Sequence, residues 1–263
     1  MMHVKRENLV ANLSFLFTDL PMMERFKATK EAGLKRVEFM FPYDLDLDEL
    51  KKELETNDLE FVLFNLPAGD WGAGERGIAL DPRRKEEFKE GVAKAIPIAK
   101  ALNVKQINCL VGKKLPDLPE EEQRATLIDN LRYAATELRK ANIKLLVEPL
   151  NHFDAPGFYL NTTDDVVKLL SEIGHDNIFL QYDTYHAARE GEDLIKVLEE
   201  KLPSIAHIQI ADNPGRHQPG TGELDYQAFF AALEKVGYKY AVSMEYVPEP
   251  DTVKSLEWIE KYN

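Results

Sequence analysis

The feature that most constrains the fold is a regular alternation of short apolar runs and longer amphipathic stretches along the whole chain. The apolar runs are rich in β-branched residues, as buried parallel strands are, and the amphipathic stretches have the apolar spacing of helices. We expect strands at residues 10–15, 36–40, 60–65, 106–111, 144–148, 178–183, 205–210 and 241–245. We expect helices at residues 21–32, 47–57, 82–102, 119–142, 163–173, 193–202, 226–236 and 252–262.

Eight strand and helix pairs in 263 residues give about 33 residues per pair, which suits a TIM barrel of about 250 residues. No linker or low-complexity tract interrupts the series, and a hydrophobic content of 44% is enough for one core. The sequence therefore predicts a single (β/α)8 TIM barrel of the α/β class, with residues 1–263 as one domain.

Four polar residues stand at the ends of the last four expected strands. They are Glu148, Asp183, Gln209 and Glu245, separated by 35, 26 and 36 residues. One carboxylate at a strand end is more often a salt bridge or a helix cap, but four on successive strands place polar oxygens together on the functional rim. A divalent cation would relieve their repulsion, and all-oxygen ligands favour magnesium, then manganese, over zinc.

Side chains alternate along a strand, so the residue two positions before each rim residue shares its inward face. The residues directly before the rim residues are expected to face outward under the helices, and they are Val147, Tyr182, Ile208 and Met244. This register places His207 below Gln209, where we expect a hydrogen-bond partner rather than a metal ligand. Glu38 also faces inward, and we expect a buried, hydrogen-bonded carboxylate there.

Glu148 and Glu245 end the fifth and eighth expected strands, far enough apart to flank a small molecule. A metal at this rim can polarise the carbonyl of a hydroxy-carbonyl substrate and acidify the adjacent C–H bond. One glutamate can then take the proton and the other return it, while Asp183 and Gln209 fix the metal.

Three loops that follow strands are long, as expected for the functional rim of a barrel. The loop from Asn65 to Pro82 has four glycines and Trp71, and it is either a mobile cover over the mouth or an ordered Ω-loop. The loops after the fifth and seventh strands bring His152, and Arg216 with His217, to the same mouth.

Composition excludes several classes of partner. Acidic residues outnumber basic ones by 46 to 33, and the net charge of −13 argues against nucleic acid. No apolar stretch approaches the ~18 residues of a membrane span. The only cysteine, Cys109, cannot form an intramolecular disulfide and is expected to be a buried, inert thiol. We therefore expect a cytoplasmic protein that acts on a small molecule, and a homo-oligomer is left open.

At this point the sequence resembles the hydroxypyruvate isomerase family of the xylose isomerase-like barrel superfamily. The resemblance covers the whole chain and rests on the motifs ANLSFLF, FNLPAGDWGAGERGIALDP, LVEPLN, QYDTYH, HIQIAD with RHQPGTGELDY, and MEY. It implies that Glu148 and Glu245 are proton donor and acceptor and also bind the metal, with Asp183 and Gln209 completing the site.

The resemblance implies conversion of hydroxypyruvate to 2-hydroxy-3-oxopropanoate (tartronate semialdehyde). An anionic substrate in a carboxylate-rich site needs cations or hydrogen-bond donors, and the candidates are His186, Arg216 and His217. His186 could instead cap the following helix, and Arg216 could be a surface residue. Many relatives have a lysine where this chain has Val247, which puts the exact substrate in doubt.

Other readings stay open. A 2-oxo-tetronate isomerase would use the same chemistry, whereas a ketose 3-epimerase usually has histidine at the position of Gln209. An endonuclease IV-like barrel would need a histidine-rich zinc cluster, which six scattered histidines and the net charge of −13 do not suit. A barrel that binds a metal and a sugar acid without catalysis would need only one of the two glutamates.

Overall fold

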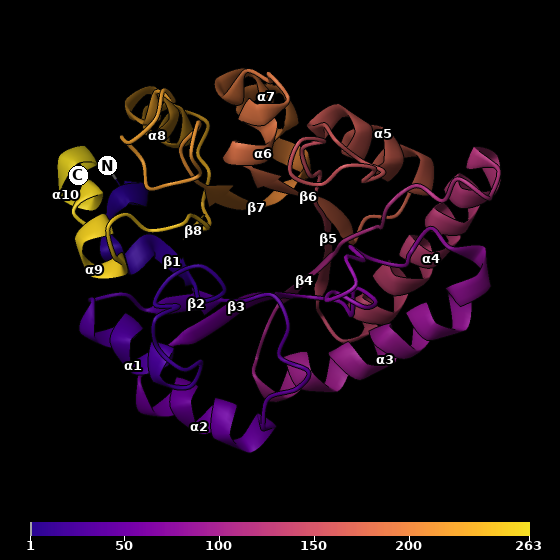
Figure 1. Ribbon diagram of the computed structural model, residues 1–263, viewed down its shortest axis with the longest axis horizontal. Helices are drawn as coiled ribbons and strands as arrows, with labels where there is room; N and C mark the ends of the chain where they lie inside the picture. Colours follow the sequence, from indigo (N-terminus) through magenta and orange to yellow (C-terminus); the bar gives the residue numbers. More distant parts are fainter. Residues whose placement is uncertain (1) are drawn as a thin grey trace.

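The computed structural model describes residues 2–263, in which eight parallel strands close into a barrel (Figure 1). The strands are β1 (Leu9–Asn12), β2 (Arg36–Glu38), β3 (Glu60–Asn65), β4 (Gln106–Cys109), β5 (Lys144–Val147), β6 (Ile178–Asp183), β7 (Ile205–Ile210) and β8 (Val242–Met244). Each strand pairs with the next in sequence, and β8 pairs with β1 to close the ring. The predicted (β/α)8 TIM barrel is confirmed.

Helices surround the strands on the outside of the barrel (Figure 1). They are α1 (Glu24–Glu31), α2 (Leu47–Thr56), α3 (Lys85–Ala101), α4 (Glu120–Lys140), α5 (Thr163–Ile173), α6 (Thr184–Arg189), α7 (Leu194–Lys201), α8 (Tyr226–Lys235), α9 (Thr252–Ser255) and α10 (Trp258–Tyr262). The short 3-10 helices are η1 (Met2–Val4), η2 (Arg6–Asn8), η3 (Pro82–Arg84) and η4 (Leu202–Ser204). Within residues 2–263, no helix is long and apolar enough to cross a membrane.

The predicted bounds of β3, β6 and β7 are confirmed, whereas the other strands end earlier than predicted. The chain turns away after Asn12, whose side-chain oxygen accepts a hydrogen bond from the Ser14 backbone N–H at 3.0 Å. Helix α6 was not predicted. It begins directly after β6 because Asp183 caps it, accepting from the Tyr185 backbone N–H at 2.8 Å.

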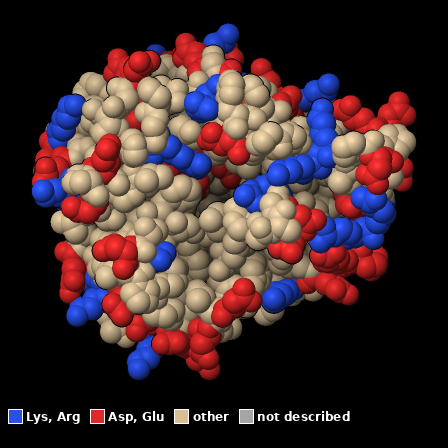
Figure 2. Space-filling view, in the orientation of Figure 1, with Lys and Arg blue, Asp and Glu red and all other residues tan. Residues whose placement is uncertain are grey.

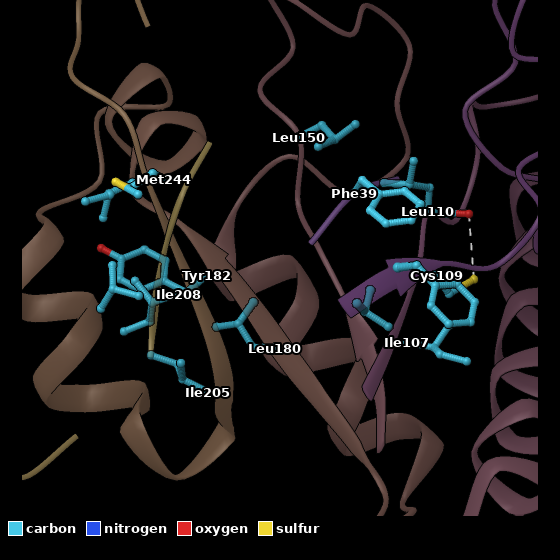
Figure 3. Close-up of a cluster of buried hydrophobic side chains, with 14 of the residues drawn as sticks. Phe39, Ile107, Cys109, Leu110, Leu150, Leu180, Tyr182, Ile205, Ile208 and Met244 are labelled. Carbon is cyan, nitrogen blue, oxygen red and sulfur yellow. Dashed lines mark hydrogen bonds between the residues drawn. The ribbon is translucent and has the colours of Figure 1, made fainter. Parts of the chain in front are cut away.

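The main core lies between the strands and the helices. Tyr182, Ile208 and Met244, predicted to face outward, are fully buried in it, and Figure 3 shows them packed together. Cys109 lies in the same layer, where burial raises the pKa of its thiol to about 12 (Figure 3). The predicted strand register and the predicted buried thiol are both confirmed. The strand residues of the opposite, inward face therefore point into the barrel.

The loop after β3 (residues 66–81) is anchored at its base. Gly77 has a φ of +111°, and a Cβ there would lie 1.8 Å from the backbone oxygen of Leu110, so only glycine allows this close approach. Asn130 of α4 donates a hydrogen bond to the Ala79 backbone oxygen at 2.8 Å. The tip, with Trp71, reaches the barrel mouth, where Trp71 lines the central cavity.

Candidate active site

A cavity of about 230 Å³ opens at the carboxyl ends of the strands. In the face shown in Figure 2, a hollow lies near the middle, and atoms of Asp or Glu residues are visible inside it. Its apolar wall contains Phe15, Phe39, Phe64, Trp71, Leu110 and Leu150. Its polar wall contains Asn12, Glu38, Asn65, Arg76, Glu148, Asp154, Gln181, His186, Gln209, Arg216 and Glu245. The cavity therefore joins apolar surface to a small set of convergent polar groups, as ligand sites do.

Three of the four predicted rim residues, Glu148, Gln209 and Glu245, line this cavity, and Asp183 lies fully buried beside them. The ligand atoms of Glu148, Asp183 and His186 lie within 4.8 Å of one another. Glu245 is not one of this group of three, and its Oε2 accepts a hydrogen bond from Gln209 Nε2 at 2.5 Å. The structure thus brings the predicted residues together as two adjoining pairs.

The orientation of the Gln209 amide differs from that expected of a metal ligand. Its Oε1 accepts a hydrogen bond from Gln181 at 2.8 Å, while its Nε2 donates to Glu38 and Glu245. The amide would have to turn over for its oxygen to face a cation between the carboxylates.

One atom of this site fits a bound cation. Asp183 Oδ2 is buried and has no hydrogen-bond partner among the described residues, although its Oδ1 caps α6. A buried carboxylate oxygen without a partner is costly unless a ligand satisfies it. Together with Glu148, it supplies the hard oxygen donors that a divalent metal prefers.

His186 is a neighbour of these carboxylates, but its protonation argues against a role as a ligand. The Asn151 backbone N–H, which can only donate, lies 3.1 Å from Nδ1, and the Asn151 side-chain nitrogen lies 2.8 Å from it. Burial, with Arg216 and Arg189, lowers the pKa of His186 well below its ordinary value, so the ring is neutral. The shorter donor contacts are those at Nδ1, which assigns the single proton to Nε2; this nitrogen lies 3.8 Å from Asp183 Oδ2 and 3.5 Å from Arg216 Nη2.

Arg216 lies in the cavity wall, as predicted for a residue at the mouth. Its guanidinium is held between the rings of Phe15 and Tyr185, with each ring centroid 4.8 Å away. Nη2 donates to Glu245 Oε1 at 3.0 Å and lies 3.8 Å from Asp183 Oδ2. Its positive charge is therefore already matched by carboxylates of the site.

Arg76, in the loop after β3, is a second cavity cation that sequence reasoning missed. Its guanidinium lies 3.8 Å over the Trp71 ring and donates to the backbone oxygens of Trp71 and Glu75. Within residues 2–263, it makes no ion pair with a carboxylate. A signal for it exists in the sequence, because Arg76 belongs to the same glycine-rich segment as Trp71.

Two histidines expected near the mouth lie outside the cavity wall. His217 Nδ1 lies 2.8 Å from the Val247 backbone oxygen, and His152 Nδ1 lies 2.7 Å from Glu190 Oε1. Val247 is 46% exposed, and its backbone N–H donates to the Arg216 oxygen at 2.8 Å. The side chain at position 247 therefore faces solvent, while the backbone there supports the Arg216 loop.

Below the rim, Glu38 and His207 form a buried pair with 2.7 Å between His207 Nε2 and Glu38 Oε2. Asn12 and Gln209 both donate to Glu38 Oε1, at 2.9 and 2.7 Å. Burial opposes the charge of Glu38, but His207 and the hydrogen bond from Gln209 hold its pKa below the ordinary value. His207 therefore acts on Gln209 through Glu38.

The rim carboxylates show the opposite shift. Burial raises the pKa of Glu148 well above its ordinary value, and the charge of Asp183 adds to the effect. Burial and then Glu148 raise the pKa of Glu245 in the same direction. Burial also raises the pKa of Asp183 to about 6, although Arg216 opposes this. Carboxyl groups with raised pKa values keep their protons to higher pH than ordinary ones and are stronger bases once ionised.

Comparisons with known proteins agree on one family. The profile of the xylose isomerase-like TIM barrel family matches residues 26–262. The hydroxypyruvate isomerase of Escherichia coli K12 is 49% identical, over 96% of this chain and 98% of that protein. The 2-oxo-tetronate isomerase of Cupriavidus necator is 36% identical, over 96% and 97%. A crystal structure described as AP endonuclease, family 2, from Brucella melitensis is 40% identical with a TM-score of 0.94, over 98% and 99%.

Proposed function

This chain belongs to the xylose isomerase-like TIM barrel family, and we propose that it is an isomerase that converts hydroxypyruvate to 2-hydroxy-3-oxopropanoate. The curated relative that is 49% identical over nearly its whole length is named a hydroxypyruvate isomerase, which supports this substrate. An isomerase of short sugar acids is the coarser statement, and other relatives named 2-oxo-tetronate isomerases agree with it.

The observation that carries the proposal is the pair Glu148 and Glu245. Both line one cavity, they follow β5 and β8, and burial raises the pKa of each. A proton shift between adjacent carbons needs one group to take a proton and another to return it. A carboxylate with a raised pKa is a stronger base than an ordinary one, and its acid form persists to higher pH.

In the reaction, one glutamate removes a proton from C3 of hydroxypyruvate, and the electron pair moves to O2 to give an enediolate. The O3 hydroxyl proton passes to O2, and the other glutamate delivers a proton to C2 as the C3–O3 bond becomes the aldehyde carbonyl. His186 Nε2–H and Arg216 Nη2 face the same space and can donate to substrate oxygens. The apolar wall excludes water from the enediol.

A divalent metal fits the carboxylate cluster, with magnesium first and manganese next. Glu148 and Asp183, whose ligand atoms lie close together, would hold it with Glu245, and Gln209 would join them with its amide turned over. When bound, the metal supplies Lewis-acid polarisation of the substrate carbonyl. If His186 also took part as a ligand, its imidazole would widen the choice to transition metals, but its Nε2 proton opposes this.

Arg76 is the cation that would receive the substrate carboxylate. Arg216 is already bonded to Glu245, whereas Arg76 donates only to backbone oxygens and is kept in place by the Trp71 ring. A guanidinium can bind a carboxylate through two parallel hydrogen bonds.

A proton-exchange assay in deuterated water tests the proposal. Hydroxypyruvate, 2-oxo-tetronates and ketoses would each be incubated with the enzyme, with and without magnesium or manganese, and followed by NMR. Metal-dependent label at the transferred carbon of hydroxypyruvate supports the favoured reaction. Exchange and inversion at C3 of ketoses would place the protein among the epimerases, and no exchange with any substrate would leave a binding protein.

A 2-oxo-tetronate is the second candidate substrate. Relatives with this name are 35–36% identical over 96% of the chain, and the position that many hydroxypyruvate isomerases fill with lysine is Val247 here. Because the Val247 side chain is exposed and outside the cavity wall, it is a weak determinant of substrate length. The ratio of kcat/KM for the two acids decides between them.

A further inference from the structure

A second cavity, of about 360 Å³, lies at the opposite end of the barrel, among the amino ends of the strands. We call it the lower cavity. The first residues of four strands help to form its wall, namely Arg36 of β2, Glu60 of β3, Gln106 of β4 and Lys144 of β5. Among residues 2–263, none lines both this cavity and the active-site cavity.

The wall of the lower cavity carries an excess of positive charge. Lys105, Lys144 and Lys239 line it, and within the described chain none of these three makes an ion pair with a carboxylate. Arg36 also lines it but is bonded to Glu60 at 2.9 Å, so that pair is neutral. In a chain with a net charge of −13, three unmatched lysines around one cavity create a local positive field.

The lysines are brought together by the fold. The Lys144 backbone N–H donates to the Lys105 oxygen at 2.9 Å, which fixes these two residues side by side at the starts of β5 and β4. The Lys144 ammonium lies 3.5 Å from the Tyr240 hydroxyl and 4.8 Å from its ring centroid. Tyr240 precedes β8, which does not neighbour β5 in the ring, so Lys144 reaches across the lower opening.

A buried imidazole gives a second indication of a ligand. The backbone of Tyr238 and of Tyr240 acts on the His3 ring, which lines the lower cavity and is 1% exposed, but its Nε2 has no hydrogen-bond partner of normal geometry among the described residues. A buried nitrogen without a partner costs free energy that a bound molecule with oxygen atoms would recover.

We propose that the lower cavity binds a compact anion with two or more negative charges, of the phosphate or dicarboxylate class. Lys105, Lys144 and Lys239 supply the charges that match it, and Gln106 and His3 supply hydrogen-bonding nitrogens. The volume is in the range of small-molecule sites. Hydrogen bonds from ammonium groups to anionic oxygens are stronger than neutral ones, so charge selects the ligand. This inference does not rest on the proposed catalytic function.

Isothermal titration calorimetry with the full chain tests it, using inorganic phosphate and, separately, succinate, at a constant ionic strength set with chloride. We expect both anions to bind to the wild type and the triple variant Lys105→Gln, Lys144→Gln, Lys239→Gln to bind about tenfold more weakly or worse. The control is Lys51→Gln, Lys196→Gln, Lys235→Gln, which removes the same charge from lysines on outer helices and should keep the affinity within about twofold.

Several results would overturn the inference. Binding that is absent from the wild type, unchanged in the cavity variant or equally weakened in the control means that no such site exists. The variant Arg76→Gln should bind phosphate as the wild type does, and a loss there would assign the anion to the active-site cavity. If the triple variant does not fold, the single changes at the exposed Lys105 and Lys239 should each weaken binding, and wild-type affinity in both would refute the site.

Discussion

Two layers of buried carboxylates lie inside this barrel, and burial has opposite results in them. In the lower layer, Glu38 is matched by His207 and by two amide donors, and its pKa is held below the ordinary value. In the upper layer, the pKa values of Glu148 and Glu245 are raised well above it. The two layers adjoin, because Gln209 donates to both Glu38 and Glu245.

The difference shows that burial alone does not decide the protonation of a carboxyl group. Each of these side chains is desolvated and accepts hydrogen bonds, but His207 offsets burial at Glu38, whereas at Glu148 and Glu245 the neighbouring carboxylates add to its effect. The upper layer has three carboxyl groups, with Arg216 as their nearest cation. The Glu38–His207 pair therefore stabilises the fold. The three rim carboxyl groups have unbalanced negative charge that a metal can offset and that proton transfer can use.

The largest effect should come from removing a proton-transfer group of the upper layer. Glu245→Gln should lower kcat for exchange at the substrate carbon by about 10³-fold, because a general acid or base contributes on the order of 10² to 10⁴. The measurement is label uptake in deuterated water. Glu249→Gln is the control, since it removes the same charge from an exposed side chain near the mouth. Near-normal exchange by the Glu245 variant would remove its assigned role.

Substitutions in the lower layer should change the stability of the protein. His207→Ala should lower the free energy of unfolding by about 3 kcal/mol, because it leaves Glu38 as a buried carboxylate without its His207 partner. Urea denaturation of the metal-free protein measures this. His217→Ala, which changes a ring outside the cavity, should cost less than about 0.5 kcal/mol. A loss below about 1 kcal/mol for His207→Ala would contradict the view that the lower layer secures the fold.

A bound metal should offset the negative charge of the upper layer only, and should thereby stabilise the folded protein. Magnesium or manganese at about 100 times its Kd should stabilise the protein by about 2.7 kcal/mol, visible as a higher Tm. Asp183→Asn should lose most of this gain, because Asp183 Oδ2 is the unpartnered oxygen of the site. His217→Ala should keep the full gain. Equal Tm shifts in the Asp183 variant and the wild type would place the metal elsewhere.

The smallest and sharpest contrast is between two matched substitutions without metal. Glu148→Gln should leave the free energy of unfolding unchanged or raise it by up to about 1 kcal/mol, because it removes repulsion with Asp183. Glu38→Gln should lower it, because it removes the partner of His207. Both are glutamate to glutamine changes at buried positions, so urea denaturation compares them directly. A similar loss in both variants would erase the distinction between the layers.

Much of the fold could be predicted from the chain, because apolar periodicity is local. The bounds of β3, β6, β7 and α5 follow from their patterns, and the outward positions Tyr182 and Ile208 are buried as the alternation requires. Helix α6 was missed because Asp183 was considered only as a rim residue and not as the cap of a helix. One side chain can do both, since one carboxylate oxygen caps while the other stays free.

The four rim residues of the candidate site were predicted to lie together, but their arrangement, the place of Arg76 and the position of His217 were not. Spacing places Glu148, Asp183, Gln209 and Glu245 at one end of the barrel, because strand ends of a closed barrel must meet there. It gives no information on which donor reaches which acceptor. The orientation of the Gln209 amide depends on Gln181, and the protonated nitrogen of His186 depends on Asn151, each from another strand or loop.

The sequence by itself determined the barrel, its inward register and the carboxylates of its rim, because periodic burial and strand order are written along the chain. Only the tertiary structure decided the partners of each buried charge. It matched Glu38 with His207, left an Asp183 oxygen without a partner, placed Arg76 in the cavity and gathered three lysines at the opposite end. The physical reason is that electrostatic balance depends on distance in space, and residues far apart in sequence supply the charges.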